Sequence, residues 1–83
     1  MISAAQMRAA RALLGIDQRQ LAAMSGVSLP TVQRMEASAG TVRGVVDTLV
    51  KVVDALEAAG IELIAPGQPS RGDGRGVRLK EAD

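Results

Sequence analysis

Residues 17–36 read Asp-Gln-Arg-Gln-Leu-Ala-Ala-Met-Ser-Gly-Val-Ser-Leu-Pro-Thr-Val-Gln-Arg-Met-Glu, and this stretch decides the fold. Its pattern predicts two short helices joined by a tight turn. Asp17, with a glutamine three residues on, forms a capping box for the first helix, and Gly26 supplies the positive φ at which that helix ends. Ser28 caps the second helix, and Pro30 lies in its first turn, where no backbone N–H is needed. The two helices share an apolar seam of Leu21, Ala22, Val32 and Met35.

This layout is that of a helix-turn-helix, whose second helix enters the major groove of DNA. The segment also resembles the Cro/C1-type (XRE-family) repressors of phages and bacteria. The family pattern has a glutamine and a Leu-Ala pair in the second helix, then a glycine and a small polar cap, an aliphatic residue in the third helix and a closing glutamate. In this sequence these positions are Gln18, Leu21-Ala22, Gly26, Ser28, Val32 and Glu36.

The resemblance continues on both sides of this segment. Residues 11–15 (Arg-Ala-Leu-Leu-Gly) are similar to the end of the family's first helix, and residues 48–56 to its last core helix. The resemblance implies a mainly α, lambda-repressor-like domain of five helices over residues 1–60. It also implies sequence-specific binding of double-stranded DNA, repression of transcription and a homodimer. Such a dimer places its recognition helices roughly 34 Å apart on an inverted-repeat operator.

Composition narrows the class of protein further. The chain has 83 residues, enough for one small domain. It contains no cysteine and no histidine, which excludes disulfides and most zinc sites, and it contains no aromatic residue, which argues against stacking on single-stranded nucleic acid. No signal peptide or membrane-spanning run is apparent. We therefore expect a cytoplasmic, nucleoid-associated protein without cofactor or metal.

Charge is unevenly divided along the chain. Residues 1–46 carry five arginines against two acids, a net +3, whereas residues 47–70 carry −3 and residues 71–83 carry +1. A positive first half suits contact with phosphates, although such a surplus is also ordinary for a solvated surface.

Apolar spacing predicts the outer helices. One runs from about Ala4 to Leu14, with a capping box of Ser3 and Gln6 at its start and Gly15 at its end. It buries Met7, Ala10, Leu13 and Leu14, with Ile16 packed just after it. The last helix runs from about Val45 to Ala59, and its core-facing stripe is Val45, Leu49, Val52, Val53 and Leu56. Three further valines, at positions 42, 46 and 50, widen that stripe beyond one small core and suggest a partner.

Residues 61–83 are expected to form a dimerisation tail. Ile61–Ala65 and Gly76–Lys80 alternate apolar and polar side chains around a loop rich in glycine, proline and serine, which predicts a short β-hairpin. Small bacterial proteins that resemble this family often have a similar ending. The alternative is a frayed tail, which we expect at least for residues 81–83. The predicted subunit contacts are Val46, Val50, Ile61, Leu63, Val77 and Leu79.

The second helix of the motif carries the residues expected to read bases. Arg34 projects outward if Val32 faces inward, and its guanidinium fork matches the O6 and N7 acceptors of guanine. Gln33, beside it, suits adenine or a phosphate. Leu29 and Pro30 cannot donate through their side chains but can contact a thymine methyl, so part of the specificity would come from DNA shape.

Phosphate contacts are expected around the base-reading side chains. The resemblance assigns one to the side chain of Gln18, at a helix N-terminus that also favours anions. The other expected phosphate contacts are Arg19, Ser28, Thr31 and Arg43, each of which would otherwise be a solvated surface residue. The resemblance further implies that Arg11 and Glu36 form a structural ion pair between helices.

No arrangement of catalytic residues is apparent, so an enzyme is not expected. Two other classes of function remain open. One alternative is a protein-interaction module, such as an antitoxin that binds a toxin and regulates its own synthesis. The other is a nonspecific architectural DNA-binding protein, which the apolar Leu29 and Pro30 favour slightly and the small number of basic residues disfavours.

Overall fold

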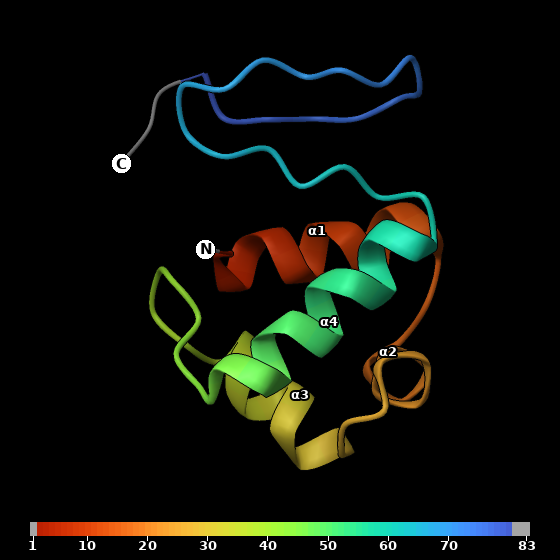
Figure 1. Ribbon diagram of the computed structural model, residues 1–83, viewed down its shortest axis with the longest axis vertical. Helices are drawn as coiled ribbons and strands as arrows, with labels where there is room; N and C mark the ends of the chain where they lie inside the picture. The colour runs from red at the N-terminus through yellow and green to blue at the C-terminus, as the bar shows by residue number, and fades with distance from the viewer. Residues whose placement is uncertain (1, 81–83) are drawn as a thin grey trace.

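The computed structural model describes residues 2–80, and over that range the chain is mainly helical, with four helices and no sheet. The helices are α1 (Ala4–Leu14), α2 (Gln18–Ser25), α3 (Leu29–Glu36) and α4 (Val46–Ala58). Figure 1 shows α3 at one end of the molecule and the segment after α4 at the other. None of the helices in the described range is long and apolar enough to cross a membrane. The fraying expected for residues 81–83 lies outside the described residues.

The helix ends follow the predicted capping signals. Ser3 and Asp17 each form a complete capping box with the glutamine three residues later, and the Ser28 side chain accepts a hydrogen bond from the backbone N–H of Thr31. Gly15 and Gly26 end the first two helices at φ values of 68° and 71°. Because a β-carbon is strained at such angles, these two glycines fix where the chain leaves each helix.

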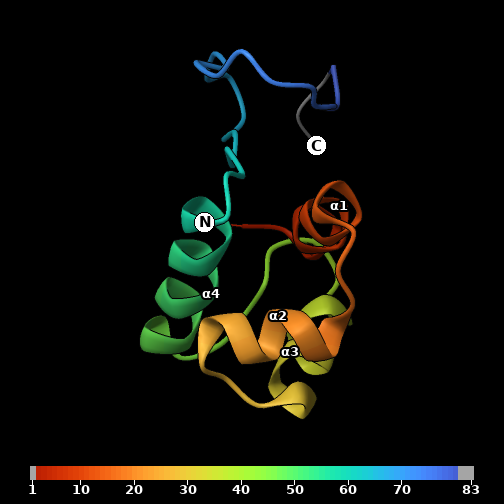
Figure 2. The ribbon, with the colours of Figure 1, turned by 90° about the vertical axis from the view of Figure 1, so that its right-hand side faces the viewer.

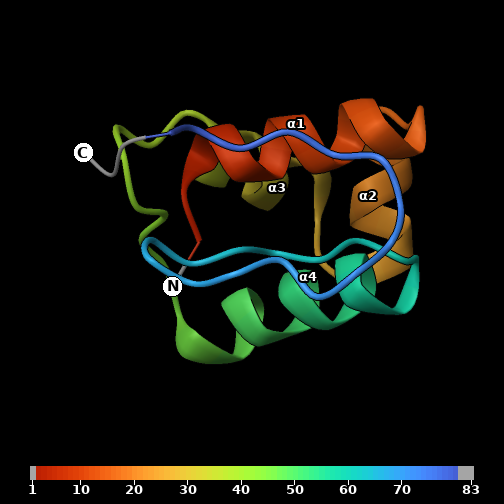
Figure 3. The same ribbon diagram turned by 90° about the horizontal axis from the view of Figure 1, so that it is seen from above.

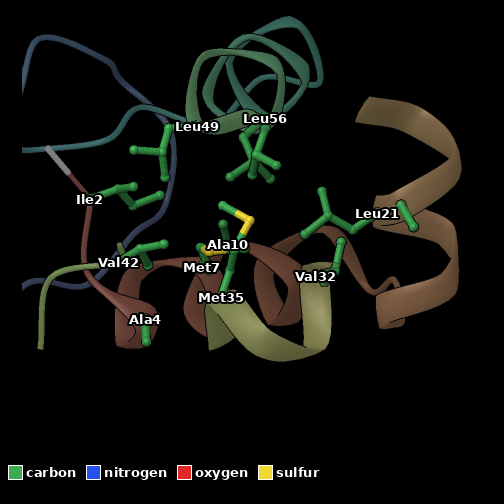
Figure 4. Packing of buried hydrophobic residues seen from close by; sticks show 12 residues of the cluster. Ile2, Ala4, Met7, Ala10, Leu21, Val32, Met35, Val42, Leu49 and Leu56 are labelled. Carbon is green, nitrogen blue, oxygen red and sulfur yellow. The ribbon is translucent and has the colours of Figure 1, made fainter. Parts of the chain in front are cut away.

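The four helices enclose a core of aliphatic side chains. Figure 2 shows α1 and α4 on opposite sides, with α2 and α3 packed beneath them. Figure 4 shows that α3 contributes Val32 and Met35, whereas α4 contributes Leu49 and Leu56. The largest fully buried side chains are Ile2, Met7, Leu21, Leu56, Val32 and Val52. The core therefore joins the helix-turn-helix to both outer helices.

The predicted fifth helix is absent from the described residues. After α3 the chain instead pairs with the N-terminus: the Ala4 N–H donates to the Gly40 carbonyl (2.9 Å) and the Val42 N–H to the Ile2 carbonyl (2.8 Å). This extended pairing uses backbone groups that another helix would have needed. It also buries Val42, so this valine belongs to the core of its own chain and is not part of the extra apolar surface that suggested a partner.

Two residues assigned to the core lie outside it. Val45 is 70% exposed because it is the extended N-cap residue of α4, outside the helical stripe. Leu13 is 51% exposed because it lies on the side of α1 that faces the C-terminal segment rather than α3. The other predicted α1 positions are as expected: Met7 and Ala10 are buried, and Leu14 is half-buried.

The C-terminal segment, residues 61–80, does not form the predicted β-hairpin within the chain. Figure 3 shows it running in three passes above α1 and α4, and none of these is a strand. Side chains take the place of backbone pairing: the Glu62 carboxylate accepts from the N–H groups of Arg71 (2.7 Å) and Gly72 (3.2 Å) and from the Ser70 hydroxyl (2.7 Å). Because two isolated strands are only marginally stable in water, these local bonds prevail.

Candidate nucleic-acid interface

Helix α3 presents a polar outer face at the end of the molecule. Val32, Met35 and Glu36 are buried, whereas the side chains of Gln33 and Arg34 are exposed. The separation follows from the 3.6-residue period of the helix, which places Val32 and Met35 on the core side. The outer face of α3 is therefore available to a partner along its length.

The two apolar residues expected to contact bases, at the start of α3, differ in exposure. Pro30 is exposed, in the first turn of the helix. Leu29 is half-buried and packs against the core. A thymine methyl can therefore reach Pro30 more directly than Leu29, whose side chain also fills space between the helices.

Hydroxyl groups line the same side of α3 as Arg34. The Ser28 and Thr31 hydroxyl oxygens lie 2.7 Å apart, and Arg34 Nη2 donates to Thr31 Oγ1 at 3.5 Å. The spacing of three residues places these side chains above one another on successive turns. They form a continuous polar surface of hydroxyl and guanidinium groups, whose remaining donors suit phosphate and base oxygens.

The other residues expected to contact phosphates differ in whether their side chains are exposed or already bound within the domain. Arg19 on α2 and Arg43 after α3 are exposed. Gln18 is half-buried, and its Nε2 donates to Glu36 Oε1 at 3.0 Å. The side chain of Gln18 is thus already bound within the domain, a second use that the sequence alone did not suggest.

Arg11 and Glu36 form the predicted pair with two parallel hydrogen bonds. Arg11 Nε lies 2.7 Å from Glu36 Oε2, and Arg11 Nη2 lies 2.7 Å from Glu36 Oε1. The side chain of Glu36 is only 3% exposed and that of Arg11 is 19% exposed. Burial alone would raise the pKa of Glu36, but the hydrogen bonds from Arg11 and Gln18 outweigh it, so the pKa lies below its ordinary value. The pair fixes α3 against α1 while both groups remain charged.

A second arginine of α1 contacts the same residue through its backbone. Arg8 Nη1 donates to the Glu36 carbonyl oxygen at 2.6 Å. Sequence reasoning missed this contact. The signal that would have indicated it is the three-residue spacing between Arg8 and Arg11, which places both guanidinium groups on one side of α1.

The predicted subunit contacts are distributed between two regions. Val46 and Val50 are exposed on α4, and Val77 and Leu79 are 80% and 75% exposed near the end of the described chain. The other two, Ile61 and Leu63, are half-buried and pack against the core of their own chain.

The arrangement of α1, α2 and α3 defines a helix-turn-helix domain, and the comparisons agree. Residues 7–44, from within α1 to the connector before α4, match a family model described as Helix-turn-helix. The match lies in the region where the sequence resembles the Cro/C1-type helix-turn-helix family of DNA-binding regulators. No curated protein and no solved structure matched the chain.

Proposed function

We propose that the protein is a sequence-specific repressor of transcription that binds double-stranded DNA as a homodimer. The observation that carries this proposal is the exposed polar face of α3, with Arg34 and Gln33 directed away from a helix that is fixed at its far end by Glu36. A recognition helix needs such a combination of free reading side chains and a rigid backbone, because misplaced donors lose the bidentate geometry that separates one base from another.

In the proposed complex α3 lies in the major groove. Arg34 donates to the O6 and N7 of a guanine, and Gln33 contacts an adenine or a phosphate. Pro30 contacts a thymine methyl, with Leu29 beside it closer to the core. Phosphates on either side are bound by Arg19, Ser28, Thr31 and Arg43 and by the N-terminus of α2, where Gln18 lies.

The homodimer explains how so small a reading surface becomes specific. Two copies would present their recognition helices about one helical turn apart, roughly 34 Å, so the operator is an inverted repeat. Val77 and Leu79 would pack against the second copy, together with Val46 and Val50 of α4. Pairing of residues 61–65 and 76–80 between chains would supply the backbone partners that these extended segments lack within one chain.

Selection of binding sites from random double-stranded DNA tests the proposal. We expect enrichment of an inverted repeat with a guanine in each half-site. Arg34→Ala should relax that position, whereas Arg75→Ala, in the C-terminal segment far from α3, should leave the selected site unchanged. Enrichment of single half-sites would contradict the homodimer. Binding without enrichment would indicate an architectural protein, and an absence of binding would reject the DNA-binding function.

A second candidate function is favoured by the exposure of Val77 and Leu79 beside the basic Arg78 and Lys80. Such a surface also fits a protein partner, as in an antitoxin that binds an acidic and apolar face of a toxin. Isolation of the tagged full chain from its native cells tests this candidate. A second protein that is retained by the wild type and lost from a Val77→Ser, Leu79→Ser variant would support it.

A further inference from the structure

Helix α3 ends differently from the two helices that precede it. Gly15 follows α1 and Gly26 follows α2, both in the left-handed conformation that closes a helix. The residue after α3 is Ala37, in the right-handed region at φ −86° and ψ −4°, and the first glycine comes only at position 40. The last carbonyl groups of α3 must therefore find other hydrogen-bond donors.

Each of these carbonyl groups has a donor. The Gln33 carbonyl accepts from the Ala37 N–H at 3.0 Å. The Met35 and Arg34 carbonyls accept from Ser38, through its N–H at 3.2 Å and its hydroxyl at 3.4 Å respectively. The final carbonyl, that of Glu36, accepts from Arg8.

The bond from Arg8 is the shortest of these and the only one from a different helix. Its Nη1 lies 2.6 Å from the Glu36 carbonyl oxygen, the length of a charge-assisted hydrogen bond. A cation at this place also opposes the partial negative charge at the C-terminal end of a helix. One arginine of α1 thus completes the end of α3 where a glycine cap is missing.

We propose that Arg8 is a positioning residue for the recognition helix. The inference rests on the proposed DNA-binding function and adds a residue to it. Arg11 binds the Glu36 carboxylate, which lies at the end of a side chain with several rotatable bonds, so this pair alone leaves the α3 backbone some freedom to shift. Arg8 binds the Glu36 backbone itself. The two arginines together fix both the position and the rotation of the helix that carries Arg34.

The closest alternative is that Arg8 contacts a phosphate directly. The two roles differ in salt dependence, because a lost phosphate contact lowers the slope of log affinity against log salt concentration by about one. A lost positioning contact weakens binding without changing the number of phosphates neutralised. Salt titration therefore separates the roles in a way that affinity at one salt concentration does not.

The test compares Arg8→Gln with Arg8→Lys and with Arg19→Gln in the full chain. Arg19 is the matched control, because it is an exposed arginine assigned to a phosphate. Affinity for the selected operator should fall roughly threefold to tenfold in Arg8→Gln with an unchanged salt slope. Arg8→Lys, which keeps a cationic donor, should recover most of the loss, whereas Arg19→Gln should lower the slope.

Amide hydrogen exchange gives a readout that does not depend on DNA. In Arg8→Gln the amides of Ala37 and Ser38 should exchange faster than in the wild type, because the end of α3 frays, and Arg19→Gln should leave them unchanged. A salt slope lowered by about one in Arg8→Gln, or unchanged exchange at both amides, would overturn the proposal. Failure of the wild type to bind DNA would reject the proposed function, and the exchange result would still decide whether Arg8 caps α3.

Discussion

The helical region, residues 2–60, and the C-terminal segment, residues 61–80, are organised by different interactions. In the helical region apolar side chains from all four helices meet in one core, and capping residues fix the ends of the helices. The C-terminal segment places only Ile61 and Leu63 against that core and leaves Val77 and Leu79 exposed. The comparison suggests that the helical region is stable by itself, whereas the segment needs a second surface.

Two glutamates show the same contrast in their surroundings. Glu36 is buried and is bound by side chains from two helices, Arg11 and Gln18. Glu62 is exposed and accepts hydrogen bonds from residues 70–72 of a neighbouring loop. The pKa of each carboxyl lies below its ordinary value, but only the first carboxylate connects separate helices of the core. A buried charge of this kind costs far more when its partner is lost than an exposed one does.

Removal of residues 61–83 should have the largest effect, and that effect should be on DNA binding. The helices keep their core, so the truncated chain should remain helical. It should be monomeric or a weakened dimer, and operator affinity should fall roughly 10²- to 10⁴-fold, because two half-sites are then bound separately. Sedimentation and operator binding measure the two changes.

A second truncation, after Ala65, sharpens this test. It keeps Ile61 and Leu63 against the core and removes Val77 and Leu79. If the exposed pair makes the subunit contact, both truncations should lose the dimer, but only the longer deletion should lower the melting temperature. A truncated chain that stays fully dimeric at micromolar concentration, with unchanged operator affinity, would leave α4 as the dimer contact.

Glu36→Ala should have the largest effect within the helical region. It leaves the guanidinium of Arg11 partly buried without its carboxylate partner, which should cost about 3 kcal/mol of unfolding free energy. Gln33→Ala, on the exposed face of α3, should cost little. Gln18→Ala should lie between them, because it removes one of the hydrogen bonds to Glu36. Equal melting temperatures for the three variants would show that the pair does not stabilise the fold.

Sequence patterns predicted the helical region well because its signals are local. Capping at Ser3, Asp17 and Ser28 and the chain reversals at Gly15 and Gly26 depend on residues within one helical turn of each other. Each lies where the sequence indicated. The Arg11–Glu36 pair was available only from the family resemblance, since nothing in the spacing of 25 residues brings the two together.

The predictions from sequence were wrong where the hydrogen-bond partners of a segment lie far away in the sequence. The connector after α3 forms a bridge with residues 2–4 instead of another helix, because the N-terminus offers it free backbone partners. Alternation over residues 61–65 and 76–80 indicated strands, but neither segment is a strand, and Glu62 is instead bound to the loop amides of Arg71 and Gly72. Alternation describes which side chains share a face. It does not show whether the backbone groups that pair with such a segment come from the same copy of the chain or from a second copy.

Arg34→Ala should change sequence preference and leave the fold intact. The side chain is exposed, and its one hydrogen bond in the described structure is the long one to Thr31. We expect a loss of about 1–3 kcal/mol in discrimination at one base pair per half-site. Competition between operators that differ only at that base pair measures the change. If the variant keeps the wild-type preference, Arg34 does not read a base.

The helical region should lose stability in acid through Glu36. Because the pKa of this carboxyl is lowered in the folded state, its contribution is fully present above the ordinary pKa of a glutamate, about 4.3. The contribution is lost as the pH falls through the lower, folded value. Unfolding free energy measured from pH 7 to pH 3 should therefore decline more steeply in the wild type than in Glu36→Gln. Parallel curves for the two proteins would contradict the assignment.

The smallest effect is expected when acid protonates Glu62 in the C-terminal segment. The pKa of Glu62 is lowered mainly by the backbone N–H of Arg71, with the Ser70 hydroxyl and the Gly72 N–H adding to it. Its three bonds should persist as the pH falls past the ordinary value and break only at the lower, folded value. Because the group is exposed and joins one loop to another, this change should move the amide resonances of Arg71 and Gly72 without altering the unfolding transition. Glu62→Gln should remove the pH-dependent shift of both resonances and leave the melting temperature unchanged. A clear loss of stability in Glu62→Gln would mean that the bonds between Glu62 and residues 70–72 support the helical core, and the distinction between the two regions would then fail.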